Sequence, residues 1–174
     1  MSVRGWIPPQ HGAWAMLVVP FVLGVMAGGA AALHLLLLPA WVLAYLASYY
    51  FLQWLRARRR QRFVRPLLVY GGLLAVVGAV LVLLQPELLL FAVLYLPGVL
   101  VNVWYARRHD DRSLVNGLVS VAQASLGVPL ANAVGAHPDW PAAWRLFALA
   151  LLYFAGTVFF VKTMIRERES TGYY

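Results

Sequence analysis

Six long apolar stretches, separated by short polar or basic connections, dominate the pattern of this sequence. A transmembrane helix needs about 20 consecutive, mainly apolar residues, and each stretch approaches that length. The pattern predicts an all-α polytopic membrane protein, with a single transmembrane domain over residues 1–174 that folds as a bundle of six helices. The predicted helices cover approximately residues 13–32, 34–55, 66–84, 88–105, 113–134 and 144–163.

The composition agrees with a membrane protein. The chain is 63% hydrophobic and 11% charged, and its mean hydropathy of +0.75 lies outside the range of soluble domains. It has no cysteine, which excludes disulfides and thiolate chemistry. Only Arg4 precedes the first apolar stretch, and no clear small-residue cleavage site follows it, so we interpret this stretch as a retained helix and not as a signal peptide.

Basic residues favour one side of the predicted membrane. They precede the first helix, lie between helices two and three and between helices four and five, and follow the sixth helix, whereas Arg145 is the exception on the other side. The positive-inside rule predicts that both termini are cytoplasmic. The net charge of +8 is therefore assigned to topology and anionic lipid headgroups, and not to nucleic-acid binding.

Polar and small side chains recur at helical spacing along the fifth predicted helix, directly after a charged loop. Hydrogen-bonding side chains are costly against acyl chains, so this stripe should face other helices or a wet cavity. On the fourth helix, Asn102 and Tyr105 share a face. We expect a site where the stripe meets the charged loop. The stripe consists of Ser113, Asn116, Gly117, Ser120, Gln123, Ala124, Gly127 and Ala131.

Two further groups of polar residues flank the helices on the basic side. His11 lies between a pair of prolines and Gly12 at the start of the first helix, where it can act as a proton donor or acceptor or as a helix cap. Lys162 and Arg166 lie one turn apart at the end of the sixth helix, where they can hold an anion or extend along the membrane interface. Both interpretations stay open for each group.

The loop after helix four adds a weak metal signal. Asp110 and Asp111 can offer oxygen ligands to a divalent cation, but the flanking arginines can equally pair with them. The sequence supplies neither a nucleophile with its base nor a pair of intramembrane histidines for haem. It also lacks the intramembrane acidic residues that couple transport to ions. These absences disfavour electron transfer through haem and ion-coupled pumping.

Three segments resemble the YwiC-like family of small bacterial membrane proteins. They are PPQHGAWAMLVVPFVLG near the N-terminus, ARRHDDRSLVNG in the middle and KTMIRERES near the C-terminus. The resemblance covers most of the chain. It implies a location in the bacterial cytoplasmic (inner) membrane.

A second resemblance is to UbiA-type prenyltransferases, which are all-helical membrane enzymes. Their Arg-Pro-Leu-x-x-Gly element is similar to Arg65–Gly71 here with one extra residue, and their Tyr-x-x-x-basic-basic element is similar to Tyr105–Arg112 followed by Asn116 and Gly117. This resemblance implies a phosphate-binding role for Arg65, Arg107 and Arg108. The Asn-Asp-x-x-Asp cluster that binds magnesium in those enzymes has no counterpart, since residues 48–54 here read SYYFLQW.

These observations lead to one main hypothesis and one alternative. The protein is expected to bind an isoprenoid or phosphorylated lipid, or another anion, at its cytoplasmic face on a prenyltransferase-like scaffold. Whether the protein is an enzyme stays open. A magnesium cofactor held by Asp110 and Asp111 stays open as well. The alternative is a non-enzymatic membrane subunit, bound to a membrane-protein partner, or a small permease. The expected ligand-binding residues are His11, Arg65, Asn102, Arg107, Arg108, Asn116, Gln123, Lys162 and Arg166.

Overall fold

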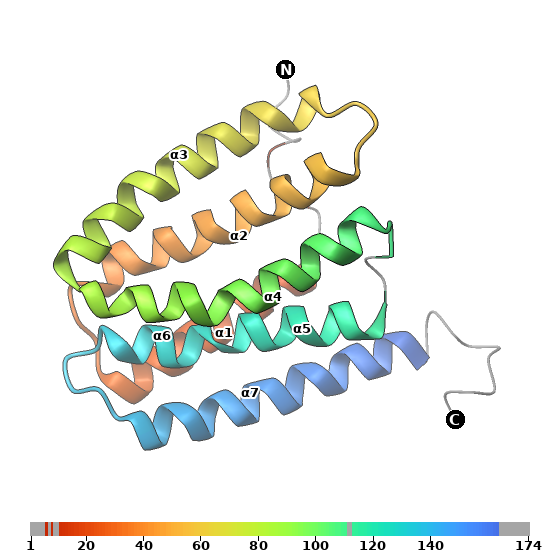
Figure 1. The fold of residues 1–174 in the computed structure, drawn as a ribbon. Helices are drawn as coiled ribbons and strands as arrows, with labels where there is room; N and C mark the ends of the chain where they lie inside the picture. The colour runs from red at the N-terminus through yellow and green to blue at the C-terminus, as the bar shows by residue number, and fades with distance from the viewer. Residues whose placement is uncertain (1–5, 7, 9–10, 111–112, 164–174) are drawn as a thin grey trace.

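The computed structural model describes residues 6, 8, 11–110 and 113–163, except for the side chain of His11. These residues form helices joined by short loops, and no strand occurs among them (Figure 1). A 3-10 turn, η2 (Pro86–Leu88), precedes the fourth helix. The helices are α1 (His11–Gly28), α2 (His34–Arg56), α3 (Gln61–Leu84), α4 (Leu89–Arg107), α5 (Leu114–Ser125), α6 (Gly127–Ala133) and α7 (Trp140–Val161).

The all-helical fold predicted from the sequence is confirmed, whereas the predicted bundle of six membrane spans is not. Five helical stretches in the described part of the chain are long and apolar enough to cross a membrane, and Gly12–Gly28 forms a shorter apolar helix. The arrangement is therefore consistent with a multi-pass membrane protein. The five stretches are His34–Arg56, Gln61–Leu84, Pro86–Arg107, Leu114–Ala133 and Trp140–Val161.

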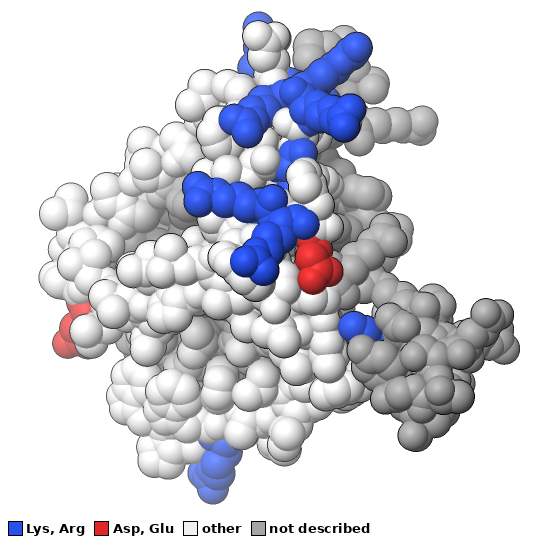
Figure 2. Space-filling view, turned by 45° about the vertical axis from the view of Figure 1, so that its right-hand side comes forward, with Lys and Arg blue, Asp and Glu red and all other residues white. Residues whose placement is uncertain are grey.

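The loops divide between two ends of the bundle that differ in charge. In Figure 1 the α2–α3 loop, the α4–α5 loop and the C-terminal end of α7 lie together at the right-hand end. Figure 2, in which this end is turned forward, shows most of the Lys and Arg side chains gathered on it. Glu87, Asp139 and Arg145 belong to the opposite end, where α3 joins α4 and α6 joins α7. We call the first end the basic end.

The fifth predicted helix, expected over residues 113–134, is divided into α5 and α6. Pro129 has no backbone N–H, so the carbonyl of Ser125 loses its usual donor four residues later, and the helix is interrupted beside Gly127. The backbone N–H of Leu130 donates to the Leu126 carbonyl oxygen (3.1 Å), so helical bonding resumes at once. Helices α1, α2 and α4 run through their own prolines without a break.

Helix α7 begins at Trp140, four residues before the start expected from hydropathy. The Asp139 carboxylate accepts a hydrogen bond from the backbone N–H of Ala142 (2.9 Å), and Pro141 lies in the first turn. Both are typical of a helix N-terminus. Hydropathy left residues 135–143 between two predicted helices because it follows apolar length alone, whereas capping decides where the helix starts.

Two glycines bring α1 against α6. A Cβ atom built at Gly24 would collide with the Val128 backbone oxygen, and one at Gly28 would lie 2.7 Å from the Asn132 backbone oxygen. Small residues four apart allow helices to approach this closely in a membrane, where packing replaces the hydrophobic effect as the cause of association. As a result α6 is buried throughout, from Gly127 to Asn132.

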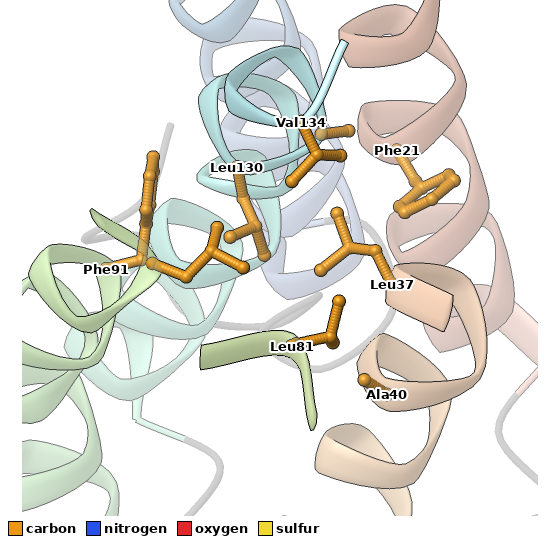
Figure 3. Packing of buried hydrophobic residues seen from close by; sticks show 9 residues of the cluster. Phe21, Leu37, Ala40, Leu81, Phe91, Leu130 and Val134 are labelled. Atoms are coloured by element: carbon orange, nitrogen blue, oxygen red, sulfur yellow. The ribbon is translucent and has the colours of Figure 1, made fainter. Parts of the chain in front are cut away.

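Apolar side chains from most of the helices meet at the end opposite the basic end. Phe21 of α1, Leu37 of α2, Leu81 of α3, Phe91 of α4 and Leu130 of α6 belong to one buried cluster, which Figure 3 shows from close by. A second buried cluster, formed by α5, α6 and α7, contains Val121, Val128, Ala143, Ala150 and Phe154. These two clusters fix the helices around the space described next.

Candidate functional site

A cavity of about 1090 Å³ extends between α1, α2, α4, α5 and the end of α7. Its lining reaches from Arg56 and Lys162 at the basic end to Leu37, Leu88 and Leu130 at the other. Leu37 and Arg56 lie on the same helix, roughly 28 Å apart at 1.5 Å per residue. We call this space the central cavity; it is nearly as deep as the hydrocarbon core of a bilayer, about 30 Å.

Amide and hydroxyl side chains of α4 and α5 form a hydrogen-bonded group on one wall. Asn102 Nδ2 donates to Gln123 Oε1 (2.5 Å), and Gln123 Nε2 donates to the Tyr95 carbonyl oxygen (3.4 Å). Ser120 Oγ donates to the Asn116 carbonyl oxygen (2.9 Å) and lies 3.3 Å from Asn102 Oδ1. All five residues line the central cavity. The stripe predicted on the fifth helix therefore faces the cavity from Asn116 to Gln123, as does Asn102 of the preceding helix.

Glycine makes this contact between α4 and α5 close. A Cβ atom at Gly98 would lie 2.7 Å from Cγ of Gln123, so a larger residue there would displace the Gln123 side chain. Gly98 thus places α4 near enough for Asn102 and Gln123 to bond directly.

Trp41 forms the deeper wall of the cavity. Its Nε1 donates to the Leu17 carbonyl oxygen of α1 (3.0 Å), one residue beyond the carbonyl that Pro20 leaves without its helical donor. Its ring centroid lies 5.9 Å from that of Tyr95. A Cβ atom at Gly127 would lie 3.0 Å from the ring. Trp41 therefore connects α1, α2, α4 and the α5–α6 junction.

Two cationic side chains lie at the basic mouth of the cavity, Arg56 and Lys162. Arg56 is in the last turn of α2, where its Nε donates to the Leu52 carbonyl oxygen (3.3 Å). Lys162 directly follows α7 and is half-buried. Ser113 lies at the same mouth and caps α5 by accepting from the Asn116 backbone N–H (3.1 Å). The capped helix terminus places Asn116 at the mouth as well.

Three predicted arginines lie outside this lining. Arg65 is exposed in the first turns of α3, and Arg107 is exposed at the end of α4. Arg108 is exposed too, and its guanidinium lies 3.8 Å from the ring centroid of Trp104. The structure therefore brings Asn102, Asn116, Gln123 and Lys162 together around the cavity but not these arginines.

Some predicted residues fall outside what the structure describes, namely the side chain of His11 and the residues Asp111 and Arg166. Gly12, next to His11, lines the central cavity. Asp110 is exposed in the α4–α5 loop, where its carbonyl oxygen accepts from the Ser113 backbone N–H (3.3 Å). Among the described residues no three His, Asp, Glu or Cys side chains lie close enough to hold a metal ion together.

Sequence reasoning missed two contributors to the cavity. Arg56 is one of the basic residues between predicted helices two and three that were assigned to topology and lipid headgroups, but among the described arginines of that group it alone lines the central cavity. Nothing in the sequence signalled this, because the predicted helix ended at residue 55, whereas α2 includes Arg56 in its last turn. Trp41 gave no signal either, because its role depends on contacts with three other helices.

Comparisons with known proteins show the family of this chain. The family described as "YwiC-like protein" matches residues 7–132. A protein of Bacillus subtilis (strain 168), "Uncharacterized protein YwiC", is 32% identical over 98% of this chain and 72% of its own length. An "Uncharacterized protein" of Haemophilus influenzae is 27% identical over 97% of this chain and 71% of its own length. No solved structure matches. With most of its length matched in this way, the chain belongs to the YwiC-like family.

Proposed function

We propose that this protein crosses the bacterial cytoplasmic membrane six times, with both termini and the basic end in the cytoplasm. The distribution of charge supports this orientation under the positive-inside rule. Helix α1 (His11–Gly28) would be the sixth span. Its 18 residues extend about 27 Å at 1.5 Å per residue, and its tight contact with the buried α6 places it within the bundle.

We further propose that the central cavity binds one isoprenoid or other phosphorylated lipid. The observation that carries this proposal is the change of polarity along the cavity. Arg56 and Lys162 lie at the mouth, amide side chains such as Asn102 lie below them, and leucine and aromatic side chains line the rest. A phosphate at the mouth would receive charge-assisted hydrogen bonds, while an apolar chain would fill the depth of the cavity.

A lipid ligand explains the cavity better than a transport path does. At the deep end the lining residues Leu37, Leu88 and Leu130 belong to the buried apolar cluster of Figure 3 and are less than one tenth exposed. A path for a polar solute would need polar groups there as well. The prenyltransferase-like scaffold is proposed from the two sequence elements alone. We do not propose that the protein catalyses prenyl transfer, because neither Arg65 nor Asp110 lines the central cavity.

Native mass spectrometry of the protein from mild detergent tests the proposal. The purified protein should retain an isoprenoid or phospholipid, and after delipidation it should bind geranylgeranyl monophosphate about tenfold more tightly than geranylgeraniol, which has no phosphate. The double variant Arg56→Gln/Lys162→Gln should lose this difference. The matched control Arg107→Gln/Arg108→Gln removes the same charge outside the cavity and should keep it.

Other results of this binding experiment would contradict the proposal in different ways. Binding of neither probe, with a protein subunit retained through purification, would overturn the lipid proposal in favour of a membrane subunit. Equal loss of affinity in both double variants would show that these basic side chains act only through general attraction to anions. Binding of monophosphate and alcohol with the same affinity would leave no role for Arg56 and Lys162 at the mouth.

A further inference from the structure

Two tyrosines of the central cavity carry hydroxyl groups that the rest of the bundle does not use. Tyr45 of α2 and Tyr95 of α4 both line the cavity. Their hydroxyl oxygens are buried, and neither has a hydrogen-bond partner among the described residues. Buried polar groups are paired in most proteins, so two unpaired hydroxyls beside one cavity need a physical explanation.

The two tyrosines lie at about the same depth in the bundle. Helices α2 and α4 run in the same direction and both end at the basic end (Figure 1). Tyr45 lies eleven residues before Arg56, the last residue of α2, and Tyr95 lies twelve residues before Arg107, the last residue of α4. At 1.5 Å per residue these separations are about 16 and 18 Å. Because the hydrocarbon core of a bilayer is about 30 Å thick, both tyrosines belong to its middle part in the proposed arrangement.

Other aromatic side chains hold both rings in the cavity wall. The ring centroid of Tyr45 lies 5.8 Å from that of Trp14, and the ring centroid of Tyr95 lies 5.9 Å from that of Trp41. Trp41 and Tyr45 are four residues apart, so they share the face of α2 that lines the cavity. Tyr95 shares the cavity-lining face of α4 with Asn102, two turns away. The tyrosines therefore belong to two walls that meet where Trp41 contacts Tyr95.

Neighbouring polar side chains of the cavity are already paired within the protein. Asn102 Nδ2 donates to Gln123 Oε1 (2.5 Å), and Gln123 Nε2 donates to the Tyr95 carbonyl oxygen (3.4 Å). Thr157 Oγ1 donates to the Phe154 carbonyl oxygen (2.7 Å). The two phenol hydroxyls differ from these groups because their donors stay unused. In the middle of a membrane lipid tails offer no acceptor, so such a hydroxyl gains most from a partner inside the cavity.

We infer that Tyr45 and Tyr95 donate hydrogen bonds to an oxygen atom within the apolar chain of the ligand, and that the ligand is an anionic lipid with a carbonyl group far from its head. A carbonyl oxygen has two lone pairs and can accept from both hydroxyls, whereas a plain hydrocarbon chain would leave both unpaired. Because the hydroxyl oxygens are buried in the wall, each ring would turn slightly toward the cavity on binding. This inference rests on the proposed function, because the same ligand has its phosphate at the mouth.

Three alkyl phosphates with chains of equal length test the inference. They are octadecyl phosphate, 12-oxooctadecyl phosphate, whose ketone lies deep in the chain, and 5-oxooctadecyl phosphate, whose ketone lies near the phosphate. The delipidated full chain in detergent should bind the 12-oxo lipid about fivefold more tightly than either of the others, as expected for one hydrogen bond of ordinary strength. Tyr45→Phe/Tyr95→Phe keeps both rings, removes both hydroxyls and should abolish this preference. Tyr153→Phe, exposed on α7 and outside the cavity lining, is the matched control and should keep it.

Thermal unfolding of the delipidated protein provides a second measurement. A hydroxyl without a partner in the protein contributes no hydrogen bond to folding, so Tyr45→Phe/Tyr95→Phe should keep or raise the Tm. The same measurement shows that the double variant is folded. A lower Tm would mean that the hydroxyls are paired within the bundle, and the inference would be wrong.

The binding results separate this inference from the proposed function. Equal affinity of the wild-type protein for all three lipids, or a preference for the 12-oxo lipid that survives Tyr45→Phe/Tyr95→Phe, would overturn the inference and leave phosphorylated lipid in the central cavity. The same preference for both ketones would also overturn it, because the recognised oxygen would then not lie at the depth of the tyrosines. Binding of none of the three lipids would overturn both proposals.

Discussion

Asn102 of α4 and Gln123 of α5 bond to each other directly, side chain to side chain, within the wall of the central cavity. Both residues also contact further partners, Ser120 and the Tyr95 carbonyl oxygen. In a membrane such bonds stabilise helix pairs because lipid offers no substitute, although the measured coupling is modest. The pair therefore belongs to the architecture of the bundle as well as to its cavity.

A double-mutant cycle should detect this bond. Asn102→Ala and Gln123→Ala are each expected to lower the free energy of unfolding by about 0.5–2 kcal/mol, with a coupling energy of about 0.6 kcal/mol between them. Unfolding in mixed micelles of increasing denaturing detergent provides the measurement. Strict additivity of the two changes would show that the bond contributes nothing to stability.

The contact between α1 and α6 should tolerate no larger residue. Gly24→Ala places a Cβ atom against the Val128 backbone, which cannot move aside like a flexible side chain, and should cost about 1–3 kcal/mol of stability. Gly78→Ala on α3 is the matched control, because nothing lies within 4 Å of its Cβ position. Thermal unfolding in detergent should show a lower Tm for Gly24→Ala only. Equal effects in the two variants would argue against tight α1–α6 packing.

Trp41 should contribute a hydrogen bond in addition to its apolar surface. Trp41→Phe removes the donor to the Leu17 carbonyl oxygen and should destabilise the protein by about 1 kcal/mol or more. Trp144→Phe, at an exposed position of α7, should stay within about 0.5 kcal/mol of the wild type. Chemical unfolding monitored by fluorescence compares them, and a larger effect at Trp144 would contradict the connecting role given to Trp41.

Features that depend on local spacing were predictable from the sequence. Hydropathy located the helices to within a few residues, and the three- and four-residue spacing of Asn116, Ser120 and Gln123 placed them on one face, which lines the cavity. These side chains face the cavity for the reason used in the prediction, namely the cost of exposing hydrogen-bonding groups to lipid. Asn102 was expected to line the same pocket, but its direct bond to Gln123 was not predicted.

Features that depend on how loops are placed in space were not predictable. The arginines between α2 and α3 look equivalent in sequence, yet Arg56 lines the central cavity and Arg65 does not. What separates them is where α2 ends relative to α5 and α7, which sequence spacing within one segment does not encode. The close approach of Gly127 to Trp41 and Pro20 likewise depends on how other helices are placed.

Labelling of single cysteines should test the proposed topology without background, because the chain contains no cysteine of its own. In intact cells a membrane-impermeant maleimide should label Ala30→Cys and His137→Cys, both exposed at the end opposite the basic end. Arg58→Cys should react only after the membrane is permeabilised. Three spans separate residues 58 and 137 in the proposed arrangement, so labelling of both positions from the same side would show that one of α3, α4 or α5–α6 does not cross.

The same assay decides whether α1 is the sixth span. Ser2→Cys lies before α1 and Ala30→Cys lies after it, so a helix that crosses the membrane must place them on opposite sides. We expect Ser2→Cys to be protected in intact cells, since α1 packs against α6 along Gly24 and Gly28 and its 18 residues reach about 27 Å. Labelling of Ser2→Cys from outside, with Ala30→Cys labelled as well, would reduce the bundle to five spans and move the N-terminus out of the cytoplasm.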